Sequence, residues 1–181
     1  MSILCLVLGG SRSGKSARGE ALAAQLSPAA PVVYVATCRS EGLDSEMQSR
    51  IQKHQDARPA DWITVENEFD LAQIAADHAG QTILIDCLTL WLSHWSEFDP
   101  EPEVTLDRLR TGLSALAEQN TQTVIVSNEL GGGLIPMEAA SRAYRDLVGT
   151  ANQIVAAHAD EVEFVIAGLP TRLKSRSHPS P

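Results

Sequence analysis

The segment Gly9–Ser16, which reads Gly-Gly-Ser-Arg-Ser-Gly-Lys-Ser, constrains the fold of this chain more than any other feature. It fits the pattern G-x-x-x-x-G-K-[ST], and it lies between an apolar run, Ile3–Leu8, and a stretch with helical spacing, Ser16–Leu26. A strand, a glycine-rich loop and a helix in this order form the phosphate-binding loop (P-loop) of many nucleotide-binding proteins. A strand-to-helix turn that contains glycines by chance is the weaker alternative.

Each residue type in this segment suits a cradle for phosphate groups. Glycines let the backbone approach phosphate oxygens closely, and the N–H groups of the loop and of the helix N-terminus point toward a bound anion. Lys15 would place its charge on the terminal phosphates, and the Ser16 hydroxyl would bind Mg²⁺. The candidate phosphate-binding residues are Gly9, Gly10, Ser11, Arg12, Ser13, Gly14, Lys15 and Ser16.

Short apolar runs rich in β-branched residues recur along the chain and indicate strands that are buried on both faces. They are Ile3–Leu8, Val32–Ala36, Ile83–Asp86, Thr123–Ser127 and Val162–Ala167. Stretches with helical spacing lie between them, at Ser16–Leu26, Leu106–Glu118 and Glu138–His158. This alternation predicts an α/β protein with a three-layer, P-loop NTPase-like fold, in which helices flank a mainly parallel central sheet.

The chain of 181 residues is long enough for one domain with a substantial core. We expect a single P-loop nucleotide-binding catalytic domain over residues 1–174. The polar, proline-ended segment 175–181 predicts a flexible C-terminal tail. The segment Glu97–Glu103, with Pro100 and Pro102, predicts an acidic exposed loop.

Charge and hydropathy exclude several classes of protein. A formal net charge of -9 argues against nucleic-acid binding, which needs a basic face. No apolar run approaches the roughly 20 residues of a membrane span, and the N-terminal run lacks the basic region of a signal peptide. Cys5, Cys38 and Cys87 show no metal-type spacing and predict buried thiols in a reducing compartment. We therefore expect a cytoplasmic protein.

Asp86 is the candidate second ligand of the metal ion. It ends the apolar run Ile83–Asp86, and ligands of parallel sheets gather at the carboxyl ends of the strands. A P-loop site uses such a carboxylate to hold Mg²⁺. The alternative is an aspartate that begins a loop or caps the following helix.

His54 is a candidate nucleophile. Asp44 can cap a helix that carries Met47, Ile51 and His54 on one face and ends before Arg58. A neutral imidazole is nucleophilic near pH 7 and can attack phosphorus. A packed, hydrogen-bonded histidine has the same spacing, and the residues alone leave both roles open.

Two other classes of P-loop protein fit less well. A regulatory GTPase would carry Asn-Lys-x-Asp after a late strand, whereas Thr123–Ser127 leads into Asn128-Glu129-Leu130 and the three glycines Gly131–Gly133. Kinases of the nucleoside-monophosphate type carry an arginine-rich lid. Here only Arg142 and Arg145, three residues apart on a predicted helix, could face one way.

Taken together, the motifs closely resemble the bifunctional adenosylcobinamide kinase / adenosylcobinamide-phosphate guanylyltransferase family of cobalamin biosynthesis. The similar segments run in order from residue 3 to about residue 174. They are Gly9–Ser16, Tyr34–Thr37, Arg50–Trp62, Thr64–Glu66, Asp86–Trp91, Ser127–Glu129 with Pro136, Arg145–Gln153 and Gly168–Pro170. The glycines at 131–133 depart slightly from the family pattern.

The resemblance implies two reactions. ATP or GTP phosphorylates the aminopropanol hydroxyl of adenosylcobinamide, and GMP from GTP is then carried on a histidine, here His54, to adenosylcobinamide phosphate. The P-loop itself predicts Mg²⁺ and a catalytic role for the charge of Lys15. The resemblance also implies a homo-oligomer that is often a trimer. The further nucleotide contacts that it implies are Ala36, Thr37, Cys38, Gln55, Asp56, Ala57, Arg58, Glu66 and Asp86.

Two other functions stay open at this point. One is a small-molecule kinase alone, in which His54 is structural. The other is a nucleotide-gated regulatory module that uses hydrolysis only as a timer. Arg58 could supply charge to the guanylyl transfer or pair with a surface carboxylate, and Glu66 could contact a purine or ribose or remain an exposed acid at a strand end.

Overall fold

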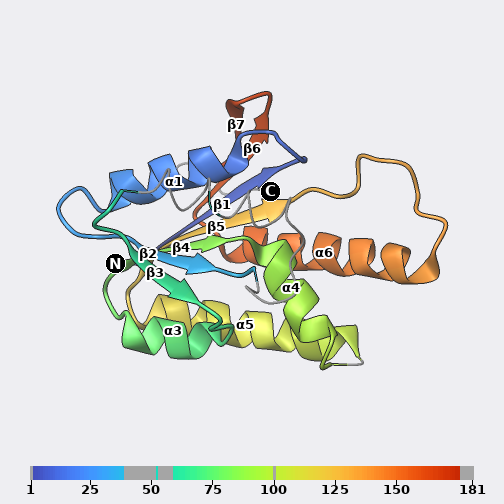
Figure 1. Ribbon diagram of the computed structural model, residues 1–181, viewed down its shortest axis with the longest axis horizontal. Coiled ribbons are helices and arrows are strands. Elements are labelled where there is room, and N and C mark those ends of the chain that lie inside the picture. Colours follow the sequence, from blue (N-terminus) through green and yellow to red (C-terminus); the bar gives the residue numbers. More distant parts are fainter. Residues whose placement is uncertain (1, 39–51, 53–58, 100, 176–181) are drawn as a thin grey trace.

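The computed structural model describes residues 2–38, 52, 59–99 and 101–175. Within them the strands form a sheet in the order β3-β2-β4-β5-β1-β6-β7 (Figure 1). The strands are β1 (Ile3–Gly9), β2 (Val33–Ala36), β3 (Ile63–Glu66), β4 (Thr82–Asp86), β5 (Gln122–Asn128), β6 (Glu161–Ile166) and β7 (Leu169–Lys174). The helices are α1 (Lys15–Leu26), α3 (Leu71–Asp77), α4 (Leu88–Ser96), α5 (Pro102–Glu118) and α6 (Ala139–His158).

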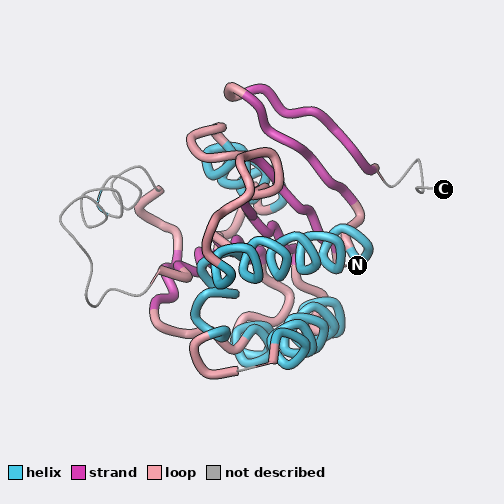
Figure 2. Tube along the Cα trace, turned by 90° about the vertical axis from the view of Figure 1, so that its right-hand side faces the viewer, coloured by secondary structure: helices cyan, strands magenta, loops and turns pink. Residues whose placement is uncertain are grey.

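All five strands predicted from the sequence are present, and their ends agree within about one residue with the predicted ranges. The pairs from β3 to β6 are parallel, and only β7 is antiparallel to its neighbour among the described strands. Figure 2 shows β6 and β7 as a hairpin beside the helices. The expected α/β fold with a mainly parallel sheet is therefore confirmed.

The apolar runs bury both faces of the sheet. On β1, Leu6 belongs to the cluster under α3, α4, α5 and α6, whereas Cys5 and Val7 belong to the cluster under α1. On β4, Ile83 and Ile85 face the first cluster and Leu84 faces the second. Successive side chains alternate between the two faces of a strand, so a continuous apolar run supplies both cores. The result is three layers.

The apolar runs did not indicate the strands β3 and β7, which lie at the two edges of the sheet. Most residues of both strands are exposed, so neither strand carries a continuous apolar run. Edge strands are half paired and need less burial than central ones. Their sequences therefore resemble loops.

One predicted boundary is wrong. The segment Glu97–Glu103 was expected to be an exposed loop, but α5 begins at Pro102, within it. Proline suits the first turn of a helix because its missing N–H would have no intrahelical partner there. The predicted helix at 106–118 is thus extended by one turn.

Two further predictions concern the C-terminal tail and the absence of a membrane span. Of the predicted flexible tail, 175–181, only Ser175 lies within the described residues. Among the helices of the described residues, none is both long and apolar enough to cross a bilayer.

The contact between α3 and α5 gives a test of the packing. A β-carbon added to Gly112 on α5 would lie 2.6 Å from Cβ of Leu71 on α3. We expect Gly112→Ala to lower the free energy of unfolding by about 1–3 kcal/mol because the core would be overpacked. Urea denaturation measures this change.

Gly149 on α6 provides the matched control, since a β-carbon there would meet no atom within 4 Å. We expect Gly149→Ala to leave stability unchanged or to raise it by up to about 1 kcal/mol, because alanine favours helix. Equal stability of the two variants would contradict the close packing of α3 on α5.

Candidate nucleotide-binding site

The P-loop joins the end of β1 to the start of α1. A β-carbon on Gly9 would lie 2.4 Å from Ser13 Oγ and 2.8 Å from the carbonyl oxygen of Val165, so the turn admits only glycine there. Gly14 precedes the first turn of α1 with a φ of 94°, a left-handed conformation that glycine adopts at little cost. The sequence therefore folds locally into a tight loop that ends at a helix N-terminus.

Two backbone hydrogen bonds hold this loop to its neighbours. The N–H of Gly168, in the turn between β6 and β7, donates to the carbonyl of Ser13 at 2.7 Å. The N–H of Glu129, just after β5, donates to the carbonyl of Gly9 at 3.1 Å. The cradle is thus fixed from both flanking strands.

The positions of the polar side chains in residues 9–16 are compatible with the binding of an anion. The Lys15 ammonium donates to the carbonyl of Gly10 at 3.1 Å, so it is folded back over the loop. The buried hydroxyl of Ser13 has no hydrogen-bond partner among the described residues. Ser11 and Arg12 are exposed at the tip of the loop. A cation and inward N–H groups at a helix N-terminus can bind phosphate.

Asp86 and Ser16, the two candidate metal ligands, face each other. The Ser16 hydroxyl donates to Asp86 Oδ1 at 3.5 Å, and the buried Tyr34 hydroxyl donates to Asp86 Oδ2 at 2.9 Å. Asp86 is therefore oriented by a tyrosine and points toward the cradle across β5. It does not serve as a cap of the next helix, since α4 has no side-chain cap.

The pair of oxygen ligands suits Mg²⁺. Among the described residues, no group of three or more His, Cys, Asp or Glu side chains could enclose a metal ion. Mg²⁺ does not need such a cage, because it is commonly held by one or two protein oxygens together with substrate phosphates and water. The hydroxyl of Ser16 and the carboxylate of Asp86 fit that requirement.

The predicted nucleotide contacts Ala36, Thr37 and Cys38 lie at the carboxyl end of β2, on the same side of the sheet as Asp86. Ala36 pairs in register with Glu66 on one side and with Asp86 on the other. The Thr37 hydroxyl donates to the carbonyl of Cys87 and accepts from its N–H, both at 2.7 Å. Thr37 thus uses its side chain, and its N–H to the Asp86 carbonyl at 3.4 Å, to join the ends of β2 and β4.

The described cysteines are free thiols. Cys5 and Cys87 are buried and Cys38 is half-buried, so burial is confirmed for two of the three predicted positions. Burial raises the pKa of both Cys38 and Cys87, which keeps them neutral at pH 7. A neutral Cys38 beside a nucleotide would not repel its phosphates.

A polar network behind the cradle was missed from the sequence. The Asn128 amide donates to Thr89 Oγ1 at 2.6 Å, and the Asn152 amide donates to the Asn128 carbonyl at 3.0 Å. The Ser127 hydroxyl donates to Asn152 Oδ1 at 2.6 Å, and the Tyr144 hydroxyl donates to the Thr89 carbonyl. Burial raises the pKa of Tyr144 to about 12, so it is a hydrogen-bond donor and not a base.

This network fixes the end of β5, which lies between the cradle strand β1 and the Asp86 strand β4. The segments 127–129 and 145–153 were expected from the sequence to be a strand end and part of a helix, with no contact assigned between them. They are about 20 residues apart, and no local pattern indicates that they touch. The structure shows that α6 holds the strand end from behind.

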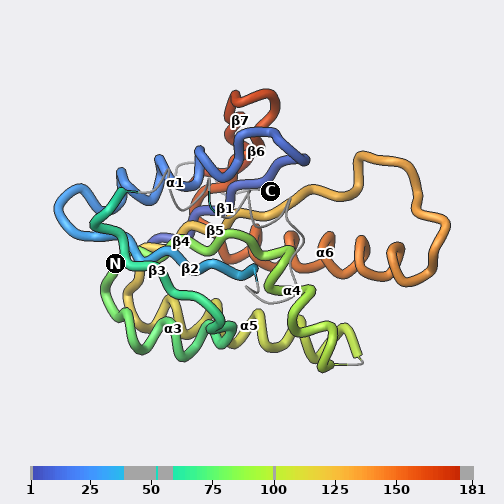
Figure 3. Tube along the Cα trace, viewed as in Figure 1, coloured from blue at the N-terminus to red at the C-terminus, as the bar shows by residue number. Residues whose placement is uncertain are grey.

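Arg142 and Arg145 hold the loop between β5 and α6, which stands out from the sheet edge in Figure 3. Arg145 donates to the carbonyls of Gly131 and Leu134, at 2.5 and 3.3 Å. Arg142 donates to the carbonyls of Pro136 and Met137. Both guanidinium groups thus bind this loop, and they do not form a lid over the cradle.

Arg18 and Glu163 tie the cradle helix to the sheet. Arg18 on α1 donates from Nε and Nη2 to the two carboxylate oxygens of Glu163 on β6, at 2.6 and 2.8 Å. Glu163 is only 4% exposed. The hydrogen bond from Arg18 holds the pKa of Glu163 below its usual range. This ion pair keeps α1, and with it the phosphate cradle, in place.

Several candidate residues cannot be placed. His54, Gln55, Asp56, Ala57 and Arg58 lie outside the described residues. Their roles as nucleophile and nucleotide contacts stay predictions.

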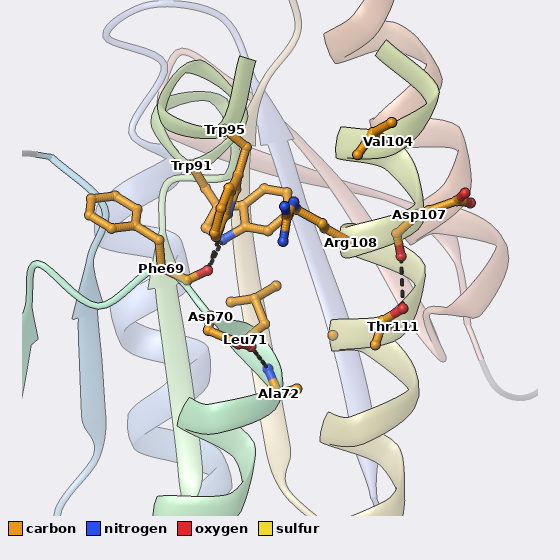
Figure 4. A pocket seen from close by; sticks show the side chains of 11 residues that line it. Phe69, Asp70, Leu71, Ala72, Trp91, Trp95, Val104, Asp107, Arg108 and Thr111 are labelled. Carbon is orange, nitrogen blue, oxygen red and sulfur yellow. Dashed lines mark hydrogen bonds between the residues drawn. The ribbon is translucent and has the colours of Figure 1, made fainter. Parts of the chain in front are cut away.

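A cavity of about 330 Å³ lies away from the cradle, between α4, α5 and the loop before α3 (Figure 4). The Phe69 carbonyl accepts from the indoles of Trp91 and Trp95 at 2.7 and 3.3 Å. The Arg108 guanidinium lies 4.1 Å from the ring centre of Trp95. None of the predicted nucleotide contacts lines it. The cavity is therefore not the nucleotide site.

Comparison with known proteins identifies the family. Residues 5–173 match the family described as cobinamide kinase / cobinamide phosphate guanyltransferase. The chain belongs to this family. The resemblance noted in the motifs is thereby confirmed, and with it the expectation of an enzyme of the kinase and nucleotidyltransferase type.

Two relatives match over nearly their whole length. The bifunctional adenosylcobalamin biosynthesis protein CobP of Pseudomonas aeruginosa is 40% identical over 171 residues, which cover 93% of this chain and 96% of the relative. The bifunctional adenosylcobalamin biosynthesis protein CobU of Salmonella typhimurium is 36% identical over 189 residues, which cover 95% and 100%.

A solved structure supports the fold. The flagellar accessory protein FlaH of Methanocaldococcus jannaschii superimposes with a TM-score of 0.52 at 15% identity, over 96% of this chain and 78% of that one. At this identity the likeness concerns the fold alone.

The Arg18–Glu163 pair predicts a pH dependence of stability. Arg18→Met would leave a buried carboxylate without its donor, and we expect a loss of about 2 kcal/mol at pH 7. The folded pKa of Glu163 lies below the unfolded one, so the pair's contribution is present above about pH 4.3 and is lost as the pH falls through the folded pKa. Urea denaturation from pH 7 to pH 3 should show the two proteins converging.

Arg110→Met is the control, because Arg110 pairs with Glu103 and Asp107 on the exposed face of α5. We expect it to change stability far less than Arg18→Met at every pH. A gap between wild type and Arg18→Met that stays constant down to pH 3 would contradict the assignment.

Proposed function

We propose that this chain phosphorylates the aminopropanol hydroxyl of adenosylcobinamide with ATP or GTP. It then transfers GMP from GTP to the new phosphate, and the products are adenosylcobinamide-GDP and pyrophosphate. The observation that carries this proposal is the phosphate cradle facing Asp86 in a chain of the cobinamide kinase family. The two steps use one nucleotide site.

In the kinase step, residues 9–16 bind the phosphates through backbone N–H groups, and Lys15 moves from the Gly10 carbonyl onto the terminal phosphates. Ser16 and Asp86 would hold Mg²⁺, which would neutralise charge on the phosphate oxygens. The substrate hydroxyl attacks the γ-phosphorus and loses its proton to water. The bond from the γ-phosphorus to the bridging oxygen breaks, and the nucleoside diphosphate leaves with that electron pair. A loose transition state needs positioning and charge more than a strong base.

In the second step, a neutral imidazole nitrogen of His54 attacks the α-phosphorus of GTP. The new N–P bond forms as the bond to the bridging oxygen breaks, and pyrophosphate leaves with that electron pair. An oxygen of adenosylcobinamide phosphate then attacks the same phosphorus and frees the histidine. We place Gln55, Asp56, Ala57 and Arg58 beside this nucleotide, with Ala36, Thr37, Cys38 and Glu66 at the strand ends.

The proposal also covers the cellular compartment, the oligomeric state and the substrates of the protein. Free thiols at Cys5, Cys38 and Cys87 accord with the reducing cytoplasm. By family resemblance the enzyme forms a homo-oligomer, often a trimer. Its substrates are adenosylcobinamide, adenosylcobinamide phosphate and nucleoside triphosphates.

A labelling experiment tests the guanylyl transfer. With α-³²P-GTP and Mg²⁺, we expect an acid-labile, alkali-stable label on the protein that His54→Ala abolishes, because a phosphoramidate is stable only in alkali. His78→Ala is the control. His78 follows α3 and contacts Gln81, which lies just before β4, at the end of that strand opposite to Asp86. The label should persist in that variant.

Other outcomes of this experiment would leave other functions. No label on an enzyme that still phosphorylates adenosylcobinamide would leave a kinase alone. Binding and slow hydrolysis of nucleotide without phosphorylation of any corrinoid would favour a nucleotide-gated regulatory module.

The cradle itself predicts the effect of Lys15→Ala. We expect kcat/KM of both reactions to fall by at least about 100-fold, because a charge aimed at the reacting phosphates is lost. Stability should be unaffected, since the hydrogen bond that Lys15 donates goes to a loop carbonyl and not to the core. Lys174→Ala is the matched control, because Lys174 on β7 donates to carbonyls at the end of α6. Full activity of Lys15→Ala would refute the shared site.

A further inference from the structure

The segment 130–137, here called the apolar loop, exposes large hydrophobic side chains to water. Leu134 is 96% exposed, Ile135 74% and Met137 97%. Contiguous apolar groups on a surface commonly mark a binding site. Figures 1 and 3 show that this loop reaches away from the sheet before α6 begins.

The apolar loop is held in this exposed position by polar groups. The Glu129 carboxylate accepts from the backbone N–H groups of Gly131 and Gly132. Arg142 and Arg145 bind the loop carbonyls of Gly131, Leu134, Pro136 and Met137. The polar groups thus turn inward to the loop's own backbone and leave the apolar side chains outward. This is the arrangement of a preformed binding surface.

The apolar loop begins at the cradle. Asn128 pairs in register with Gly9, and the Glu129 N–H donates to the Gly9 carbonyl at 3.1 Å. The next residues therefore leave the sheet at the mouth of the phosphate site. The apolar loop therefore offers a surface next to the cradle for a second substrate that reacts with a bound phosphate.

We propose that the apolar loop binds the corrin ring of adenosylcobinamide. This inference rests on the proposed function and names the surface that the substrate uses. The ring is a large macrocycle with methyl groups along its rim, and its hydroxyl lies at the end of a flexible arm. The ring stays outside the cradle on Leu134, Ile135 and Met137, while the arm reaches the γ-phosphate.

The described cavity offers no alternative place for the ring. Its walls come from α4, α5 and the loop before α3, and none of its lining residues belongs to residues 9–16 or to the apolar loop. A ring bound there would not share an element with the phosphate site. The apolar loop, in contrast, is joined to the cradle by a hydrogen bond.

The test uses Leu134→Ser and Met137→Ser in the full chain. Both side chains are almost fully exposed, so folding should be unaffected. The matched control is Leu173→Ser, an apolar residue of the edge strand β7 that is 59% exposed. Equilibrium dialysis with adenosylcobinamide, read by corrin absorbance, gives Kd. Kinase assays give KM and kcat, and sedimentation velocity gives the oligomeric state.

For each apolar-loop variant we expect the Kd and KM for adenosylcobinamide to rise at least about tenfold, because apolar contacts are lost. The kcat at saturation, the affinity for GTP and the oligomeric state should stay as in the wild type and in Leu173→Ser. This split separates a surface that binds substrate from a residue that merely stabilises the fold.

Three results would overturn the proposal. Unchanged corrinoid binding in an active enzyme would show that the ring lies elsewhere, while the proposed function stands. Dissociation of the oligomer in the variants would show that a second copy of this chain covers the apolar loop. A wild-type protein that neither binds nor phosphorylates adenosylcobinamide would remove the proposed function itself.

Discussion

The alignment of the parallel strands at their carboxyl ends is the constraint on which the site depends. Ladder hydrogen bonds bring Gly9 opposite Asn128, and Ala36 opposite both Asp86 and Glu66. A shift of one strand by one residue would move each of its side chains to the opposite core, where it would meet different neighbours. The same burial that stabilises the sheet therefore fixes the positions of the phosphate loop and its carboxylate. Ser16 reaches Asp86 only because β1, β5 and β4 end at a common edge.

The phosphate cradle supplies positive potential locally in a chain whose net charge is negative. With a formal net charge of -9, the protein repels nucleotides at long range. Within the loop, backbone N–H groups and Lys15 supply positive potential at close range, where screening by salt is weakest. The charge of the nearby Arg18 is paired with Glu163. Arg142 and Arg145 donate to carbonyls of the loop between β5 and α6. Lys15, whose ammonium donates to the Gly10 carbonyl of the cradle itself, can turn onto the phosphates.

The parts of the fold that were predictable are those with local signals. The central strands carry continuous apolar runs, and the P-loop carries a fixed spacing of glycine, lysine and serine. The edge strands β3 and β7 carry no such run because most of their residues face water. The bonds of Asn152 to Ser127 and Asn128 join distant segments, and no periodicity indicates them. The spacing of Arg142 and Arg145 indicated a shared face but not the carbonyls that they bind.

Two reactions at one cradle require that different phosphates face different partners. For the kinase step the γ-phosphate must meet the substrate arm, and we place that substrate beside β5, where the apolar loop begins. In the proposed guanylyl step the α-phosphate would meet His54, which lies outside the described residues. Among the described strands, β4 with Asp86 lies between β2 and β5, from which the apolar loop leaves. The hydrogen bond from Asn128 to Thr89 ties the end of β5 to the segment that follows Asp86. The hydrogen bond from Thr37 to Cys87 ties the end of β2 to the same segment. A single carboxylate strand can then serve both transfers without rearrangement of the sheet.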